Sequence, residues 1–523
     1  MIAPSTSPLP TFVEDLLREQ QDMTAVERFA LEHAELSSSP TERRYRSLLP
    51  ATAPQPGQQY GFEVDLDRCS GCKACVTACH AMNGLDDNET WREVGLLIGG
   101  RVSLPVLQHV TTACHHCVEP GCMSACPTLA YEKDPVTGIV KHLDDQCFGC
   151  QYCVLACPYE VPKFHAAKGI VRKCDMCSSR LKAGEAPACV QACPHEAIRI
   201  SLVDIAGLRR DVATNDFLPT APSARFTIPT TKYVTERAGG TELRSGDEDV
   251  DTPEHNHVPL MVMLVLSQVA VGLFIAGAVT TAAARMGLLA TGWLFGLGAI
   301  VTATAHLGRP WLAYRAVLGW RTSWLSREII AFGALQAVAT VAVVCATEAE
   351  QLGAAAADGI AWLTVVMGLT AVWCSAMIYA VTPRTYWALP YTATKFFGTT
   401  MLVAALASGL VGTGGTMAFS VVSLVALVKL IVESRQRHAP GDDRWAERSS
   451  RLLYGPLRDA WIVRCGLLML FGIVGPMLLA SAHPSSTVAG GLIAIGCLAA
   501  EFCERALFFR AAAAPRMPRG IAG

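Results

Sequence analysis

The sequence has little charge, and the charge it has is nearly balanced. Only 17% of its 523 residues are charged, while 51% are apolar and the mean hydropathy is +0.32. A formal net charge of −2 leaves no excess of Lys and Arg for nucleic-acid phosphates, which excludes a nucleic-acid partner. So apolar a composition predicts that part of the chain lies in a lipid bilayer.

The first residues also lack the apolar core of a signal peptide after Met1. The sequence therefore predicts no cleaved export signal, although a partner subunit could carry the targeting signal for the complex. Residues 1–56 form an extension in which apolar side chains recur at roughly helical spacing between Phe12 and Leu36. This pattern predicts one amphipathic helix, a candidate contact for a partner.

Cysteine, in contrast, is abundant and unevenly distributed. Sixteen of the 21 cysteines fall between Cys69 and Cys193, within a Gly- and Pro-punctuated region that we delimit as 57–200. They form four quartets: Cys69, Cys72, Cys75 and Cys79; Cys114, Cys117, Cys122 and Cys126; Cys147, Cys150, Cys153 and Cys157; Cys174, Cys177, Cys189 and Cys193. Bound metal is expected to hold this region together more than apolar bulk does.

The spacing within the quartets is that of ferredoxin motifs. Three cysteines on a tight loop hold three corners of a cubane, and the fourth serves a neighbouring cluster, so the quartets must work in pairs. Zinc is the main alternative, because Cys-x2-Cys pairs also build tetrahedral zinc sites, but it leaves the third and fourth cysteines unexplained. We expect four [4Fe-4S] clusters with these sixteen cysteines as iron ligands. Spacing alone does not determine which triad pairs with which fourth cysteine.

The second half of the chain predicts an all-α transmembrane bundle of eight helices within residues 258–512. It follows a polar linker or clasp, 201–257, and precedes a basic tail, 513–523. Each apolar stretch is close to the ~20 residues that a spanning helix needs. The eight expected spans are 259–284, 287–307, 326–346, 358–382, 394–412, 416–434, 461–482 and 486–509.

Arginine and lysine gather in the loops on one side of these spans, the side on which the cysteine region lies. By the positive-inside rule this side is cytoplasmic, so we expect an inner-membrane protein whose cysteine region faces the cytoplasm. The counted residues are Arg309, Arg315, Arg321, Arg327, Arg384, Lys395, Arg435, Arg437, Arg444, Arg448, Arg451, Arg458, Arg464, Arg510, Arg516 and Arg519.

Two residues near the second and third spans are candidates for chemistry, His306 and Glu328. Titratable side chains at the ends of apolar helices are costly unless they are functional or reach the headgroups. A histidine can hydrogen-bond a quinone oxygen and a buried carboxylate can relay its proton, so both are candidates for a quinone site. Histidines are scarce in the spans and form no facing pair, so no haem is expected.

The cysteine region resembles the four-cluster electron-transfer subunit of the dimethyl sulfoxide reductase family of molybdenum enzymes, over about residues 60–240. The resemblance rests on Tyr60-Gly-Phe-Glu-Val-Asp, Cys69-Ser-Gly-Cys-Lys-Ala-Cys, Cys147-Phe-Gly-Cys-Gln-Tyr-Cys and Arg172-Lys-Cys-Asp-Met-Cys. It implies an α+β ferredoxin-like domain of two paired dicluster modules, with a separate molybdopterin-containing catalytic subunit as partner.

The resemblance also implies the ligand sets, because quartets one and four, and two and three, exchange ligands in that family. The first cluster would face the molybdenum subunit and the last the membrane. The implied sets are Cys69, Cys72, Cys75 and Cys193; Cys174, Cys177, Cys189 and Cys79; Cys114, Cys117, Cys122 and Cys157; Cys147, Cys150, Cys153 and Cys126.

The membrane half resembles the anchor subunit of the same reductases, through His306-Leu-Gly-Arg-Pro and Trp324-Leu-Ser-Arg-Glu. In that anchor the matching histidine and glutamate are linked to quinol binding. The chain is thus expected to be a fused electron-transfer and anchor subunit that passes electrons between menaquinone or ubiquinone and its partner. The partner's substrate would be a sulfur compound such as sulfite or dimethyl sulfoxide, and a cytoplasmic catalytic subunit favours sulfite.

An alternative is a redox-sensing or ion-translocating membrane protein with an iron–sulfur domain. That function needs charged or polar residues inside the spans, and the spans as delimited contain very few.

Overall fold

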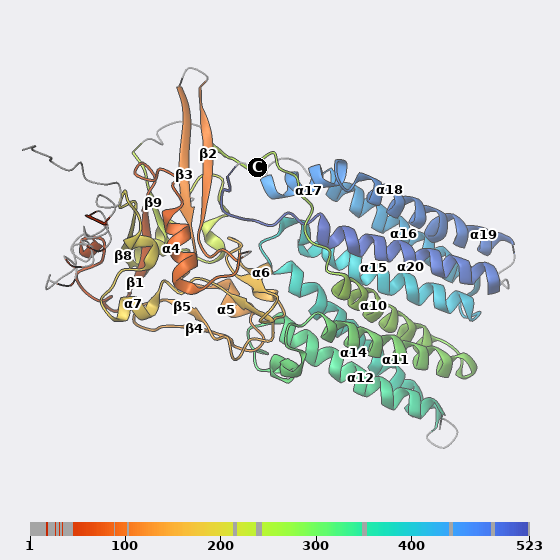
Figure 1. The fold of residues 1–523 in the computed structure, drawn as a ribbon. Coiled ribbons are helices and arrows are strands. Elements are labelled where there is room, and N and C mark those ends of the chain that lie inside the picture. The colour runs from red at the N-terminus through yellow and green to blue at the C-terminus, as the bar shows by residue number, and fades with distance from the viewer. Residues whose placement is uncertain are drawn as a thin grey trace, which may run out of the picture.

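The computed structural model describes residues 45–520, except 88, 102–103, 213–216, 237–242, 348–352, 439–442 and 483–486, with a few positions before 45. The amphipathic helix expected between Phe12 and Leu36 lies, but for those few positions, outside the described residues. The described chain has a cysteine-rich part at one end and a bundle of long helices at the other (Figure 1).

The cysteine-rich part is organised by short sheets. Strand β1 (Gln58–Asp65) is the middle strand of the first sheet, antiparallel to β8 (Ile198–Asp204) and parallel to β9 (Lys232–Val234). Phe62 and Val64 of β1 are buried in this part's core, as expected for alternate residues of a half-buried strand.

The second sheet is a long hairpin that projects from the body of this part (Figure 1). Strands β2 (Glu93–Arg101) and β3 (Leu104–Thr112) form the hairpin, and β10 (Leu243–Ser245) adds to β2. Residues 201–257 thus contribute β9 and β10 to the sheets of the preceding region. Two small hairpins complete the strands: β4 (Tyr131–Lys133) with β5 (Val140–His142), and β6 (Lys163–His165) with β7 (Ile170–Arg172).

Short helices accompany the cysteine quartets. They are brief because Gly, Pro and the cysteine loops interrupt them. They are α4 (Ala74–Asn83), α5 (Gly121–Ala125), α6 (Tyr152–Ala156), α7 (Ser178–Lys182) and α8 (Ala188–Gln191), with α9 (Ile205–Asp211) following β8.

Within the described residues, seven helical segments are long and apolar enough to cross a membrane. They coincide with the first seven expected spans: α10 (Val258–Val279), α11 (Ala282–Ala305), α12 (Trp324–Thr347), α14 (Ala354–Ala380), α15 (Leu389–Leu410), α16 (Gly415–Arg437), and the segment Arg458–Ser481, which comprises α18 (Arg458–Leu467), η4 (Leu468–Val474) and most of α19 (Gly475–Ala482).

The eighth expected span, 486–509, is a helix in the structure, α20 (Thr487–Arg510), but it is not among the seven. Its second half carries Glu501, Glu504 and Arg505, all buried. The expectation that the spans contain very few charged residues is therefore wrong.

Connecting segments complete the membrane part. They are η2 (Pro310–Val317) after α11, η3 (Thr385–Trp387) after α14 and α17 (Arg444–Tyr454) after α16. After α20 the chain runs back along the hairpin, where Leu96 donates its backbone N–H to Arg519 O and the Arg519 side chain pairs with Glu93 and Glu160.

Candidate functional site

The loops of the first and third quartets are shaped by left-handed residues. Gly71 and Lys73 have φ of 75° and 59°, and Gly149 and Gln151 have φ of 76° and 60°. Glycine adopts this conformation without strain, and such turns direct successive backbone N–H groups into one concavity that favours anions. The two loops share this geometry because they share the Cys-x-Gly-Cys-x-x-Cys sequence.

Backbone amides also reach the last cysteines of two quartets. Ala130 N lies 3.3 Å from Cys126 Sγ, and Ala197 N lies 3.3 Å from Cys193 Sγ. Hydrogen bonds to sulfur stabilise a thiolate and raise the potential of any cluster it holds.

The last cysteine of each quartet lies near thiols of another quartet. Burial raises the pKa of Cys69, and the nearby thiols of Cys75 and Cys193 raise it further. Burial and the neighbouring Cys189 raise the pKa of Cys79 to about 12.

The same grouping recurs in the second pair of quartets. Burial raises the pKa of Cys117 well above its usual value, and Cys114 and Cys157 add to the effect. Burial also raises the pKa of Cys150, with Cys126 as its strongest charged neighbour. Thiols this difficult to ionise become thiolates when a metal binds them.

The donor set of the four quartets consists of thiols. All sixteen cysteines are free, and Cys thiolates are the usual ligands of [4Fe-4S] clusters. The residues present therefore fit such clusters.

Two buried cations lie among the cysteines. Arg92 is 2% exposed and donates to Thr111 Oγ1 at 3.1 Å, beside the side chain of Cys75. Lys173 is 3% exposed, donates to Val140 O, and has its Nζ 3.7 Å from Cys114 Sγ. Sequence reasoning missed both, because a single Arg or Lys near a motif gives no signal of burial.

The loop after α11 docks directly on the third quartet. Arg309 N donates to Phe148 O at 3.0 Å, and Ser323 Oγ donates to Ala125 O at 2.6 Å. Gly149, Gly169 and Gly308 meet here so closely that a Cβ on Gly308 would lie 2.2 Å from Gly169 O. Backbone-to-backbone packing of this kind fixes the third quartet against the membrane helices.

A cavity of about 310 Å³ opens where the two parts meet. Phe148, Cys150, Tyr152 and Leu155 contribute to its wall from the cysteine-rich part, and α10, α11, α12, α14 and the segment from His306 through η2 supply the rest. The polar residues of its lining are Cys150, Tyr152, Ser267, Thr304, His306, Glu328 and Tyr379, and the remainder is mostly apolar. A volume of this order accommodates a small aromatic ring system.

His306 and Glu328, predicted from the sequence, both line this cavity. His306 Nδ1 and Glu328 Oε1 are buried and have no hydrogen-bond partner in the part of the chain that the structure describes. Glu328 is only 4% exposed. Buried polar atoms without partners are costly, and their presence in a cavity points to a polar ligand.

Other cavity residues were not foreseen. Tyr152 donates its hydroxyl to Ile378 O at 3.1 Å and so joins the cysteine-rich part to α14. Tyr379 had no signal in the sequence, since a tyrosine near a helix end is usually an interfacial anchor. Outside the cavity lining, Tyr386 and Trp387 of η3 are also buried, and Trp387 Nε1 donates to Phe508 O at 2.8 Å.

Some residues counted for the charge bias are not loop residues. Lys395 and Arg464 lie inside α15 and α18 and are 2% and 0% exposed. Arg384 and Arg448 are buried as well. These four residues are therefore not exposed loop charges of the kind that the positive-inside rule counts.

Comparisons with known proteins agree with this division. Residues 106–202 match the 4Fe-4S dicluster domain family, and residues 253–439 match the family described as DMSO reductase anchor subunit (DmsC). The chain thus joins an iron–sulfur electron-transfer region to a multi-pass membrane anchor.

Curated relatives match the first of these regions. The B subunit of the anaerobic dimethyl sulfoxide reductase of Haemophilus influenzae is 35% identical over 181 residues, which are 33% of this chain and 87% of the relative. The B subunit of the Escherichia coli K12 enzyme is 34% identical over 179 residues, 33% of this chain and 86% of the relative. The thiosulfate reductase electron transfer subunit PhsB of Salmonella typhi is 36% identical over 161 residues, 30% of this chain and 83% of the relative.

The chain therefore belongs to the dimethyl sulfoxide reductase family, as an iron–sulfur subunit fused to its membrane anchor.

Proposed function

We propose that this chain carries electrons between a quinone bound in the 310 Å³ cavity and a molybdopterin-containing catalytic subunit. The observation that supports this most is the lining of the cavity, where Cys150 of the third quartet shares a wall with His306 and Glu328, each of which has one buried polar atom without a partner among the described residues. A quinone in this cavity would contact both a cluster-bearing loop and two titratable side chains, His306 and Glu328. Two-electron, two-proton chemistry requires both an electron acceptor and proton acceptors at the same ligand.

The four clusters would be held as the resemblance implies, by cysteines from paired quartets. When bound, they supply one-electron carriers whose potentials depend on burial and on hydrogen bonds to sulfur. The positions of the quartets suggest the order of the clusters along the electron path. The quartet containing Cys150 contacts the membrane helices, whereas Cys72 of the first quartet is exposed to solvent. An exposed cysteine at the far end suits contact with the catalytic partner.

In the cavity, His306 would hold one quinone oxygen through Nδ1, and Glu328 would exchange a proton at Oε1 with the other. The apolar remainder of the lining excludes water and favours a ring with a hydrocarbon tail. Tyr152 would hold the wall in place by its bond to α14.

The test is quinol-driven reduction of the clusters. Glu328→Gln removes a proton-transfer group and is expected to slow this reduction ~10²-fold. His306→Ala removes a binding group and is expected to slow it ~10-fold. The iron content of both variants should stay the same. Glu132→Gln, an exposed glutamate on β4, is the control. Normal reduction rates in both cavity variants would refute the assignment.

The ligand sets are tested separately. Cys150→Ser should remove or alter one cluster, visible by electron paramagnetic resonance, and stop electron flow at its membrane end. Cys503→Ser, in the membrane part, should change neither. Unchanged spectra in the Cys150 variant would contradict the fourth ligand set.

The partner's substrate is proposed from the relatives, which are named for dimethyl sulfoxide and thiosulfate reduction. A sulfur oxyanion or sulfoxide, sulfite included, is the class we infer. We also infer that α20 crosses the inner membrane as the eighth span, with the cysteine-rich part on the cytoplasmic side. Protease access to that part in inside-out vesicles, and protection in spheroplasts, is the expected result.

A further inference from the structure

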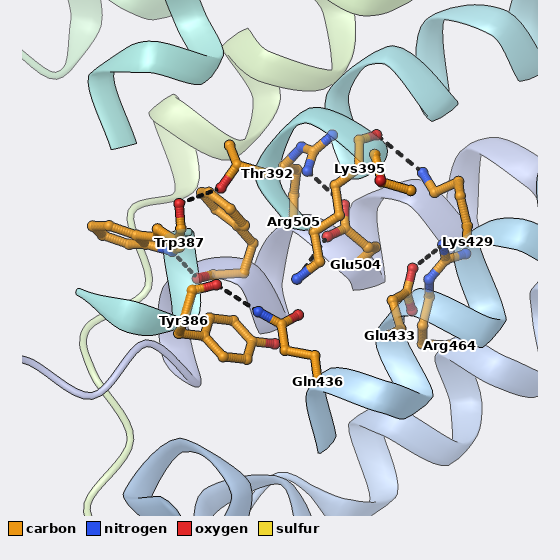
Figure 2. A network of polar contacts seen from close by, with 12 residues as sticks. Tyr386, Trp387, Thr392, Lys395, Lys429, Glu433, Gln436, Arg464, Glu504 and Arg505 are labelled. Atoms are coloured by element: carbon orange, nitrogen blue, oxygen red, sulfur yellow. Dashed lines mark hydrogen bonds and ion pairs between the residues drawn. The ribbon is translucent and has the colours of Figure 1, made fainter. Parts of the chain in front are cut away.

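A buried ionic cluster lies among the helices of the membrane part that do not line the cavity. Figure 2 shows several of its side chains converging from α15, α16, α18 and α20. Four cations face three carboxylates, and each is 6% exposed or less: Lys395, Lys429, Arg464 and Arg505 with Glu433, Glu501 and Glu504. Ionisable residues within membrane spans are expensive and are by default functional candidates.

One half of this cluster is tightly paired. Glu501 Oε2 lies 2.5 Å from Lys429 Nζ and accepts from Thr399 Oγ1, while its Oε1 lies 3.3 Å from Arg464. Arg464 also pairs with Glu433 at 2.9 Å. Cys465 and Cys497 are the neighbouring thiols, and Cys497 donates to Phe471 O. Each carboxylate of this half has at least one close partner, which is typical of a structural network.

The other half, around Glu504, is loose. Arg505 Nη1 lies 2.6 Å from Glu504 Oε2, whereas Glu504 Oε1 is buried with no hydrogen-bond partner among the described residues and lies 3.7 Å from Lys395 Nζ. Lys395 instead lies over the ring of Tyr386 at 4.5 Å. An unpartnered oxygen on a carboxylate that is 1% exposed is a place where a proton or a water can bind.

Helix α10 separates the loose half of the cluster from the cavity and contacts both. Ser267 of α10 lines the cavity, and the adjacent Gln268 accepts from Arg505 Nη2 at 2.7 Å. Gln268 Nε2 is itself buried, and no described residue hydrogen-bonds to it. Tyr379, also in the cavity wall, packs on Phe508, whose ring centroid is 5.0 Å away.

The two sites also lie at similar depth. Glu504 is six residues from Arg510 at the end of α20, or ~9 Å along a helix. Glu328 is four residues from the start of α12, or ~6 Å. Both ends face the cysteine-rich part (Figure 1).

We propose that Glu504, paired with Lys395, is a second proton-accepting site that serves the cavity. The inference rests on the proposed function. Oxidation of a quinol breaks two O–H bonds, sends two electrons to the iron–sulfur row and releases two protons. Glu328 accepts one, and water beside Gln268 carries the other to Glu504 Oε1, which becomes a neutral carboxylic acid. The proton then leaves past Lys395 and Tyr386 to the face on which the cysteine-rich part lies.

The test is infrared difference spectroscopy of the intact complex, oxidised against quinol-reduced. A newly protonated carboxyl group gives a C=O band that shifts in D2O. Two such bands are expected, one lost in Glu328→Gln and the other in Glu504→Gln. Lys395→Met, which removes one of the two cations beside Glu504 and leaves Arg505 in place, should shift or abolish the second band, so it decides the matter if Glu504→Gln does not fold.

Glu433→Gln is the matched control, because it changes the same residue type in the tightly paired half, and it should keep both bands. A single band, lost in Glu328→Gln only, would overturn this inference and leave the proposed function intact. If quinol reduced no cluster in the unaltered complex, the proposed function would fail and this inference with it.

Discussion

Two polar regions of the membrane part, the cavity and the ionic cluster, differ in how many of their buried polar atoms have partners. In the cavity, Glu328 Oε1 and His306 Nδ1 are buried atoms with no hydrogen-bond partner among the described residues. In the tight half of the ionic cluster, the single carboxylate of Glu501 contacts three groups: Lys429, Arg464 and Thr399. Polar groups matched to one another stabilise a fold, whereas groups left open are available to a ligand. By this difference, the tight half of the ionic cluster stabilises the helix bundle, whereas the cavity is available to a ligand.

The largest effect is expected from breaking the tight half. Arg464→Met leaves Glu433 and Glu501 without their shared cation, and removing one partner of a buried pair costs about 3–5 kcal/mol. Thermal unfolding in detergent measures this loss. Arg458→Met, at the exposed start of α18, is the control and should unfold normally. Equal stability of the two variants would show that the cluster is not a structural lock.

The opposite sign is expected in the cavity. Glu328→Leu removes a buried carboxylate that lacks a partner for one oxygen, a group that costs ~1–3 kcal/mol of desolvation. The variant should therefore be about 1–2 kcal/mol more stable by the same unfolding measurement, while losing quinol-driven cluster reduction. A destabilised variant would mean that Glu328 serves the fold, and the comparison would no longer hold.

The sequence predicted the cavity residues and the cysteine quartets better than it predicted the ionic cluster. Cys-x-x-Cys spacing and long apolar runs are local patterns, so they can be identified one segment at a time. Lys395 and Arg464 instead look like loop charges near the ends of apolar runs. Their burial depends on partners from other helices, Glu504 and Glu501, which are 109 and 37 positions away. Such pairing is set by tertiary packing and leaves no local trace.

A smaller effect should distinguish the two kinds of site within the iron–sulfur region. Lys173 is a matched cation beside the sulfur of Cys114, and a buried positive charge favours the more negative, reduced state of a cluster. Lys173→Met should lower the midpoint potential of a neighbouring cluster by on the order of 60 mV, one tenfold change for one electron. Redox titration followed by electron paramagnetic resonance measures it, with exposed Lys168→Met as control. Identical potentials would mean that the lysine only positions Val140.

The smallest effect is expected where matched charges lie outside the membrane, near water. Asp247 is 5% exposed and joins the linker to the C-terminal segment through Arg516, with Ser245 as a second donor. Although burial alone would raise the pKa of Asp247, the Ser245 hydroxyl and the Arg516 guanidinium lower it overall.

A carboxylate with a lowered pKa stabilises the fold above its unfolded pKa, and this contribution is lost as the pH falls through the native pKa. Asp247→Asn should therefore cost about 1 kcal/mol at pH 7, less than a pair inside the membrane, because water screens the linker. The gap between variant and parent should begin to narrow below the ordinary aspartate pKa of 3.8, where the unfolded parent is protonated, and it should close only below the lowered native pKa. Chemical unfolding at pH 7 and at pH 3 measures the change. A gap as wide at pH 3 as at pH 7 would mean that shape, rather than charge, holds the linker there.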